Sequence, residues 1–395
     1  MVPLLRGIRL LELSSVVMGP MAGQILADLG AEVVKLEPIE GEVSRGTLPR
    51  HGDISAMYAS NNRNKRVVAA DLKSDAGQAI AHRLIARSDA LLINMRPEAA
   101  QRLGLGYDEV AKIRPDIVYC AVIGYGERGR YRGRPAFDDV IQAAAGLADL
   151  GRRNGEAPRF VPTILADKIG ALHAAYALLA ALTAKARGHA GAMYVEVPMF
   201  EAMAATVLNE HLAGATFDGC GKPGYSRVLS KDRRPFQTLD GWMAVLPYTH
   251  EQWRRFLLEI ARADLVAQPW FDSATERSAH IDELYAAVSN GLRERSNADW
   301  QETLLRLDIP FAPVTSLEDL LVDPHLADIG FFQPSPAYPP EIKRSVAQPI
   351  NFGTLATLPD QPPRSLGADT RSILQECGYE DDEIDGMVKR GNIRL

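Results

Sequence analysis

The first forty residues constrain the fold most strongly, because apolar runs alternate there with a helical repeat. Residues 8–13 (IRLLEL) predict a buried strand, residues 21–30 (MAGQILADLG) have helical spacing, and residues 31–36 (AEVVKL) predict a second strand. A strand, a helix and a strand in this order are typical of a parallel sheet with right-handed crossovers.

The same alternation continues through the first half of the chain. Further helices are predicted at 75–86, 97–103, 107–113 and 167–187, and further strands at 90–94 and 116–123. The long last helix is expected to end at Gly188, and the run MYVEVPM after it reads as another strand. Strands this apolar are usually covered on both faces. We therefore predict an α/β fold with a Rossmann-like, doubly wound large domain.

The second half has a different composition. A linker rich in Gly, Pro and charge spans 219–234, FQTLDGWMAVLP predicts a hairpin, and residues 331–366 predict an extended, proline-rich tail. Helices are predicted at about 250–262, 281–293 and 297–306. We expect a large Rossmann-like domain in residues 1–220 and 326–395, and a smaller α+β domain in 225–325.

Charge and cysteine content exclude several classes of function. The 395 residues carry a net charge of -6, which argues against nucleic acid as the main partner. The three cysteines show neither a disulfide framework nor a metal-ligand spacing, so no metal is expected. The N-terminus lacks the features of a secretory signal, and the apolar stretch 171–184 is too short to span a bilayer. We expect a soluble, cytoplasmic protein with no membrane partner.

The sequence contains one literal G-x-G-x-x-G, at Gly124–Gly129. A dinucleotide-binding loop must open a helix directly, whereas here the helix is delayed past residue 136. A glycine-rich surface loop is the favoured interpretation.

Asp167 stands at the start of the long alanine-rich helix. There the unpaired N–H groups and the helix dipole are expected to lower the pKa of its carboxyl and keep it ionised. An aspartate in this position is more often a structural cap than a catalyst, and the pattern alone does not separate the two.

Polar residues follow the predicted strands at the edge where open α/β sheets bind ligands. The basic run 61–66 is interpreted as a solvated loop, with phosphate binding as the alternative. Lys73, Asn94, Arg96 and Arg102 share the ligand-binding edge, and together they indicate a candidate site.

The first half of the chain resembles the class III CoA-transferases, a family that includes formyl-CoA transferase, carnitine CoA-transferase and 2-methylacyl-CoA racemase. The resemblance is carried by LADLGAEVVKLEP (26–38), NNRNKRVVAADLKSDAG (61–77), the run 93–129, ILADKIGALHA (164–174) and GHAGAMYVEVPMFEA (188–202). It implies an interlocked homodimer of ring-shaped chains that uses an acyl-CoA and a small carboxylic acid as substrates.

The resemblance also implies roles for individual residues. Asp167 falls on the catalytic aspartate of the family, which is acylated during turnover. The positions that match CoA contacts are Val17, Met18, Ala70, Asp71, Leu72, Lys73, Asn94, Met95, Arg96, Arg102, Pro135, Ala136, Phe137 and Asp138.

Two departures from the family bear on function. Pro38 replaces an arginine of formyl-type transferases, so one phosphate ligand is missing or is supplied elsewhere, for instance by Arg45. Phe137 stands where racemases carry a histidine, so a two-base proton transfer lacks one partner. We therefore expect a CoA-transferase and keep two alternatives, a 2-methylacyl-CoA racemase or epimerase and a catalytically idle CoA-binding protein.

Overall fold

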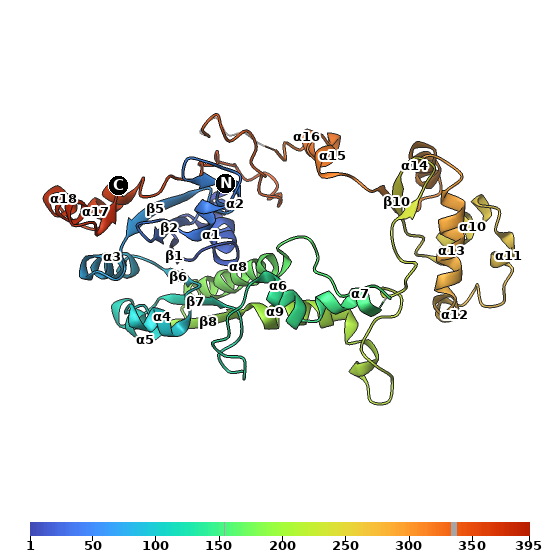
Figure 1. Ribbon diagram of the computed structural model, residues 1–395, viewed down its shortest axis with the longest axis horizontal. Helices are drawn as coiled ribbons and strands as arrows, with labels where there is room; N and C mark the ends of the chain where they lie inside the picture. Colours follow the sequence, from blue (N-terminus) through green and yellow to red (C-terminus); the bar gives the residue numbers. More distant parts are fainter. Residues whose placement is uncertain (154, 333–337) are drawn as a thin grey trace. The chain divides into compact units, whose positions relative to one another are not determined.

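The computed structural model describes residues 1–153, 155–332 and 338–395 (Figure 1). The chain divides into two compact units. The large unit contains Met1–Leu147, Phe160–Thr206 and His325–Leu395, and the small unit contains Ala148–Arg159 and Val207–Pro324. Part of the predicted extended tail, residues 333–337, lies outside the described residues. The domain limits proposed from the sequence, at 220, 225 and 326, stay a prediction.

A seven-stranded sheet forms the centre of the large unit, in the order β12-β5-β2-β1-β6-β7-β8. All neighbouring strands are parallel except β12, which runs antiparallel to β5. The strands are β1 (Arg9–Leu13), β2 (Glu32–Glu37), β5 (Lys65–Ala70), β6 (Ala90–Ile93), β7 (Val118–Ile123), β8 (Met193–Pro198) and β12 (Ile393–Arg394). The predicted α/β fold with a large parallel sheet is confirmed.

The order of the six parallel strands determines where a ligand would bind. Numbered along the chain, they lie in the order 3-2-1-4-5-6, which is that of dinucleotide-binding folds. The chain moves outward in one direction from β1 through β2 to β5, and then in the other from β6 through β7 to β8. The switch therefore lies between β1 and β6, and ligands of open α/β sheets bind at the carboxyl ends of the strands beside such a switch.

Helices cover both faces of this sheet (Figure 1). On one face α1 packs against α8, and α6 also contacts α8. On the other face one apolar core joins α3, α5, α17 and α18 to the strands. The helices of the large unit are α1 (Met18–Asp28), α2 (Ala56–Asn61), α3 (Asp75–Ala86), α4 (Pro97–Arg102), α5 (Tyr107–Ile113), α6 (Asp138–Ala144), α8 (Leu165–Ala186), α16 (Pro324–Asp328, whose first residue lies in the small unit), α17 (Thr370–Glu376) and α18 (Asp381–Lys389).

The small unit has its own core, built around a three-stranded antiparallel sheet. Trp253, Phe256, Tyr285 and Trp300 are almost fully buried there. The antiparallel pairing of β9 with β10 is the hairpin that the sequence predicts. The elements of the small unit are β9 (Phe236–Gln237), β10 (Trp242–Val245), β11 (Phe311–Pro313), α7 (Leu150–Arg153), α10 (His250–Glu259), α11 (Ala263–Val266), α12 (Ala274–Ala279), α13 (Ile281–Leu292), α14 (Asn297–Arg306) and α15 (Leu317–Leu320). Helix α9 (Met199–His211) passes from the large unit into the small unit.

Among the described residues, α8 is the one helix long and apolar enough to cross a membrane by length and composition alone. The core helix of a soluble protein passes the same test. Here α8 packs against α1, α6, β7 and β8, and several of its alanines are fully buried.

Candidate active site

A cleft of about 250 Å³ opens at the carboxyl ends of three adjacent strands, β1, β6 and β7. This is the switch point of the sheet, and all lining residues belong to the large unit. The cleft is lined by Ser15, Val16, Met18, Asn94, Arg96, Pro97, Val122, Ile123, Gly124, Tyr125, Glu127, Gly133, Arg134, Pro135, Ala136, Phe137, Asp167 and Met199.

Of the two acidic residues that line this cleft, Glu127 and Asp167, Asp167 is the buried one. It is the third residue of α8 and only 9% exposed. Its side chain does not cap its own helix, because Oδ1 accepts a hydrogen bond of 3.2 Å from the backbone N–H of Met18, the first residue of α1. In the described parts of the chain Asp167 forms no ion pair, and Oδ2 accepts no hydrogen bond. The carboxylate therefore faces the N-terminus of a second helix and is not consumed by a salt bridge.

Close packing brings α1 and α8 together at this point. A Cβ added to Gly170, one turn after Asp167, would lie 2.6 Å from the Met18 methyl group. Glycine at position 170 thus lets the Met18 side chain lie across α8. This packing fixes the separation between the Met18 N–H and the carboxylate.

Asp138 holds the backbone of the nucleophile candidate. This carboxylate is 8% exposed, and its Oδ1 accepts a hydrogen bond of 3.0 Å from the Asp167 N–H. Its Oδ2 accepts one of 2.6 Å from Gln142, whose own carbonyl oxygen accepts from the Val161 N–H in the segment that leads into α8. Both oxygens of Asp138 are therefore engaged inside the protein.

The pKa of Asp167 is raised to about 6 from the ordinary value of 3.8. Burial is the largest cause and the nearby negative charge of Asp138 is the second, while the Met18 N–H acts in the opposite direction. The prediction that helix-terminal N–H groups would lower this pKa was wrong, because they are outweighed by desolvation. At neutral pH the carboxylate is still mostly ionised, and it is more basic than an exposed aspartate.

The turn between β1 and α1 adopts a strained conformation. Val16 has φ = +72°, a region that a β-branched residue rarely enters and that costs on the order of 1–3 kcal/mol. Side chains from other elements hold it in place. Asn94 donates to the Ser15 carbonyl oxygen at 2.9 Å and accepts from its N–H at 3.2 Å, and Glu42 accepts from the Val16 N–H at 3.1 Å.

Buried ion pairs lie beneath this turn. Lys35, which is completely buried, donates to Glu12 at 2.8 Å and to the Ser14 carbonyl oxygen at 2.7 Å. Lys65 lies 2.8 Å from the other Glu12 oxygen and donates to the Pro20 carbonyl oxygen, and burial lowers its pKa to about 8. These pairs connect β1, β2 and β5 to the backbone of the turn.

Two expectations from the sequence are wrong in this region. The run 61–66 is not a solvated loop, since Asn61, Asn62, Arg63 and Lys65 are all buried and hydrogen-bonded. Arg45 is not free to bind a phosphate in place of the arginine that Pro38 replaces. It is 5% exposed and is consumed by Glu37, Asp53, Tyr58 and the Arg364 carbonyl oxygen.

The residues expected to bind CoA fall into two groups. The cleft brings together Met18, Asn94, Arg96, Pro135, Ala136 and Phe137 with Asp167. Val17, Asp138, Met95, Arg102 and the segment 70–73 do not line it, although Ala70 ends β5 at the same edge of the sheet. Lys73 and Arg102 are exposed.

The glycine-rich loop is the main feature that sequence reasoning underestimated. It is not a dinucleotide fingerprint, since α6 begins only at Asp138, but Gly124 and Tyr125 line the cleft. Glu201 accepts a hydrogen bond of 3.1 Å from the Gly126 N–H and anchors the loop to α9. Arg134 also lines the cleft, with its guanidinium 4.1 Å from the Tyr131 ring centre. The signal available in the sequence was the position of this loop directly after β7, the strand beside β6.

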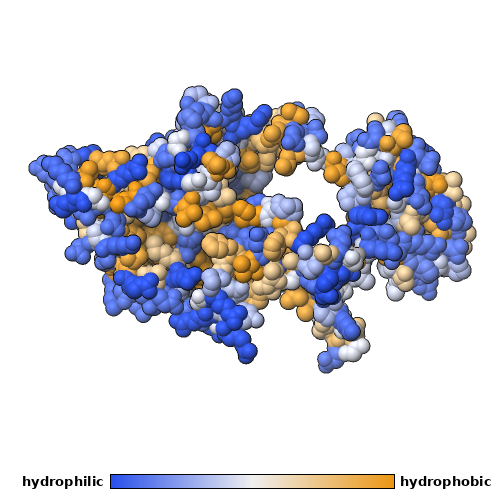
Figure 2. All heavy atoms as spheres, in the orientation of Figure 1, coloured by the Kyte–Doolittle hydropathy of each residue, from blue (hydrophilic) through white to orange (hydrophobic). Residues whose placement is uncertain are grey.

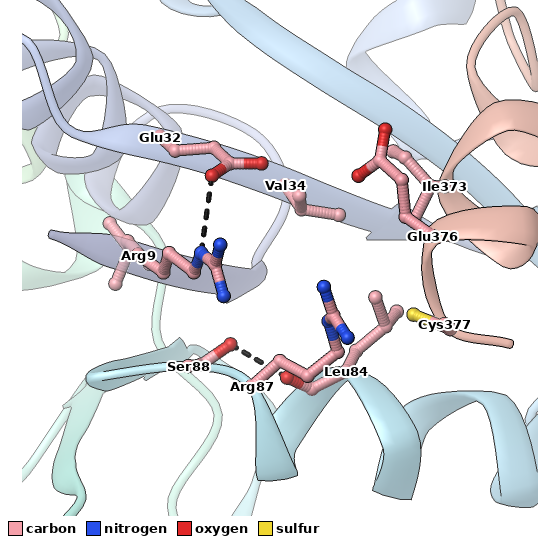
Figure 3. Close-up of a pocket in the computed structure, with 10 residues that line it drawn as sticks. Arg9, Glu32, Val34, Leu84, Arg87, Ser88, Ile373, Glu376 and Cys377 are labelled. Carbon is pink, nitrogen blue, oxygen red and sulfur yellow. Dashed lines mark hydrogen bonds and ion pairs between the residues drawn. The ribbon is translucent and has the colours of Figure 1, made fainter. Parts of the chain in front are cut away.

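A second hollow lies at the opposite, amino-terminal edge of the sheet (Figure 3). Its volume is only about 40 Å³, and the charged groups that line it include the Arg9–Glu32 ion pair. Arg87 and Cys377 also line it, and they directly follow α3 and α17. It is too small for an acyl thioester and lies away from the switch point.

The fold and the cleft together define an α/β protein with a buried, unpaired carboxylate at the switch point of its sheet, in the part of the chain that is described. The model of CoA-transferase family III matches residues 5–370. An acyl-CoA transferase of Fusarium pseudograminearum is 30% identical over 97% of this chain and 88% of its own length. Human succinyl-CoA:glutarate CoA-transferase is 28% identical, with 98% and 89% covered. The crystal structure of Rv3272 from Mycobacterium tuberculosis superposes with a TM-score of 0.80 at 26% identity, covering 94% of this chain and 99% of that one. The chain belongs to CoA-transferase family III and is an enzyme of that family.

Proposed function

We propose that this enzyme moves CoA from an acyl-CoA to a free carboxylic acid, with Asp167 as the group that is acylated. The observation that supports this most directly is the buried Asp167 carboxylate, which lines a cleft and forms no ion pair among the described residues. A pKa of about 6 makes it a stronger nucleophile than an ordinary aspartate, while most of it is ionised at neutral pH.

The proposed reaction has four steps, each of which exchanges one acyl bond for another. An Asp167 oxygen attacks the thioester carbonyl and the C–S bond breaks. CoA departs as the thiolate, and the acyl group remains on Asp167 as a mixed anhydride. The thiolate attacks the aspartyl carbonyl and releases the donor acid, which gives an aspartyl-CoA thioester. The acceptor carboxylate attacks this thioester, forming a second anhydride and thiolate. The thiolate then takes the acceptor acyl group and frees Asp167.

Each tetrahedral intermediate carries an oxyanion that needs hydrogen-bond donors. The Met18 N–H at the start of α1 already points at the carboxylate and is placed to serve an intermediate formed on it. The positive end of the α1 dipole acts on the same charge.

We propose that CoA enters along the cleft with its charged groups toward Arg96 and Arg134. Both arginines line the cleft and are exposed, so they can meet phosphate oxygens bidentately. Lys73 and Arg102 do not line the cleft, and we propose that they contact parts of CoA that extend beyond it. Asn94 is different, since its amide is engaged with Ser15 and supports the turn.

The racemase alternative receives no support. Phe137 lines the cleft and is 72% exposed, and no histidine is among the lining residues. A proton exchange at the α-carbon would lack its second base.

We further propose that the enzyme is a homodimer. An apolar surface gathers over α6 and α8 (Figure 2). Val140, Leu172 and Tyr176 are 47%, 50% and 59% exposed. Such patches mark interaction sites on soluble proteins. Native mass spectrometry tests the dimer. If the two chains are interlocked, tagged and untagged dimers will not exchange subunits until they are unfolded, and rapid exchange would contradict interlocking.

The covalent step is tested by giving the purified enzyme succinyl-CoA or acetyl-CoA together with a pool of candidate acids. Intact-mass analysis should show an adduct on Asp167 that hydroxylamine traps, and new acyl-CoA species identify the acceptor. Asp167→Ala should lose exchange, whereas Asp139→Ala, at an exposed position of α6, should retain it. Full exchange by Asp167→Ala would disprove the mechanism.

A further inference from the structure

The hydrogen bond that the Asp167 carboxylate accepts depends on the conformation of the turn between β1 and α1. The donor is the Met18 N–H, and the direction of that N–H is set by the backbone at 15–17. Val16 lies two residues before the donor, with φ = +72°. If Val16 relaxed to an ordinary negative φ, the peptide groups after it would turn and the N–H would no longer point at Asp167.

Three side chains oppose this relaxation, each at a different one of the four residues between β1 and α1. Lys35 binds the Ser14 carbonyl oxygen and Asn94 binds both backbone groups of Ser15. Glu42 accepts from the N–H of Val16 itself. Of the three, Glu42 is the one that contacts the strained residue.

Glu42 is held rigidly enough for this task. It is 5% exposed, and the same oxygen that accepts from Val16 accepts from the Ser44 N–H at 2.9 Å. Its other oxygen accepts from the Ser44 hydroxyl at 2.7 Å and lies 3.8 Å from the Lys35 ammonium. The Glu42 N–H in turn donates to Glu37 at 3.0 Å. Because these contacts exist before substrate arrives, no reorganisation is needed during the reaction.

We propose that Glu42 is a positioning residue for Asp167, which holds Val16 in its left-handed conformation and so directs the Met18 N–H at the nucleophile. Glu42 does not line the cleft, so it acts through the turn and not on the substrate. The role rests on the proposed function of Asp167 and extends the site by one residue that CoA and acid do not touch.

The proposal is tested by combining changes at Glu42 with a change that removes the need for it. Glu42→Ala deletes the acceptor, and we expect kcat for CoA exchange to fall about 10- to 100-fold with a smaller change in KM. Glu42→Gln is isosteric, but its neutral oxygen binds the two N–H groups more weakly, so we expect a loss of about 3- to 10-fold. Glu40→Ala, at an exposed position of the same loop, serves as the matched control and should behave as wild type.

Val16→Gly is the diagnostic partner, because glycine adopts φ = +72° without steric cost. When Val16→Gly is added to either Glu42 variant, kcat of the double variant should return most of the way to kcat of the Val16→Gly single variant. The pH profile gives a second signature. The charged group that faces Asp167 is Asp138 from α6, and the Met18 N–H from α1 opposes it. Removing that N–H should therefore shift the acid limb of exchange to higher pH in the Glu42 variants.

Thermal melts show which Glu42 variant is folded, and Glu42→Gln keeps the test available if the alanine variant is not. Wild-type kcat in a folded Glu42 variant would overturn the proposal. So would a loss that Val16→Gly does not recover and that leaves the acid limb unmoved. Failure of the covalent role of Asp167 would be seen in a different result, because the Asp167→Ala variant would then still exchange CoA.

Discussion

Asp138→Asn should extend CoA exchange to lower pH. The asparagine carbonyl oxygen can still accept from the Asp167 N–H, so the backbone of the nucleophile stays in place, although the amide nitrogen cannot accept the hydrogen bond that Oδ2 receives from Gln142. The negative charge, the second-largest cause of the raised Asp167 pKa, disappears. Burial, the largest cause, remains. The pKa of Asp167 should therefore fall from about 6 part of the way toward 3.8.

The size of the effect follows from the ionised fraction. With a pKa of about 6, roughly a tenth of wild-type Asp167 is ionised at pH 5. If the pKa of Asp167 fell by about one, which is equivalent to ~1.4 kcal/mol, the ionised fraction at pH 5 would rise to about a half. The assay is kcat/KM for the acyl-CoA donor between pH 4.5 and 8, where the free enzyme determines the limb. We expect about a fivefold gain over wild type at pH 5, relative to the plateau of each enzyme.

Ionisation of the substrate is common to both enzymes, so the difference between their profiles reports on the protein. Asp139→Asn, a neighbouring exposed aspartate, should leave the limb where it is. If Asp138→Asn is folded and its limb coincides with that of wild type, the charge of Asp138 does not act on Asp167. A shift to higher pH would refute the electrostatic reasoning altogether.

Three further outcomes are expected. Asp167→Asn should stabilise the fold by roughly 1–3 kcal/mol at pH 7.5, because the raised pKa means that the ionised carboxylate opposes folding above its unfolded pKa of 3.8. The gain in stability should be absent below about pH 4 and should grow between about pH 4 and 6. Urea unfolding that shows an equal gain at pH 3.5 would contradict this. Iodoacetamide should label the exposed Cys220 in the native enzyme and spare Cys120, whose burial raises its pKa to about 12, as peptide mass spectrometry would reveal. Lys35→Met should cost about 3–5 kcal/mol in unfolding free energy by leaving Glu12 without one of its cations, and a urea midpoint close to that of wild type would argue against a strong buried pair.

The sequence was informative wherever burial follows periodicity. Helix α3 and helix α5 have the predicted limits of 75–86 and 107–113, and Gly188, with φ = +92°, follows the end of α8 as expected. Apolar spacing fixes these elements locally, because each buries one face or both faces against the sheet.

The site was harder to predict because its parts meet only through the sheet. Lys35 and Lys65 resemble ordinary surface lysines until β2 and β5 are placed beside β1, where Glu12 receives both. The raised pKa of Asp167 likewise depends on Asp138, which arrives from another helix. Strain at Val16 has no signature in the sequence, since valine is a poor choice for positive φ. The family resemblance gave the nucleophile candidate, and neither it nor the position of Asp167 along the chain gave the electrostatic environment of that residue.

The edge strand β12, which pairs with β5, has a consequence for the biosynthesis of the protein. β5 pairs with β2 on one side and with β12 on the other, yet Ala70 and its partner Ile393 are separated by most of the chain. At ordinary translation rates of about 5–20 residues per second, the flank of β5 stays open for roughly 15–65 s on the ribosome. An open strand flank attracts other strands. The small unit, whose main segment is complete earlier, can fold during this interval, whereas the Rossmann-like sheet acquires its last strand only when the residues after 392 emerge.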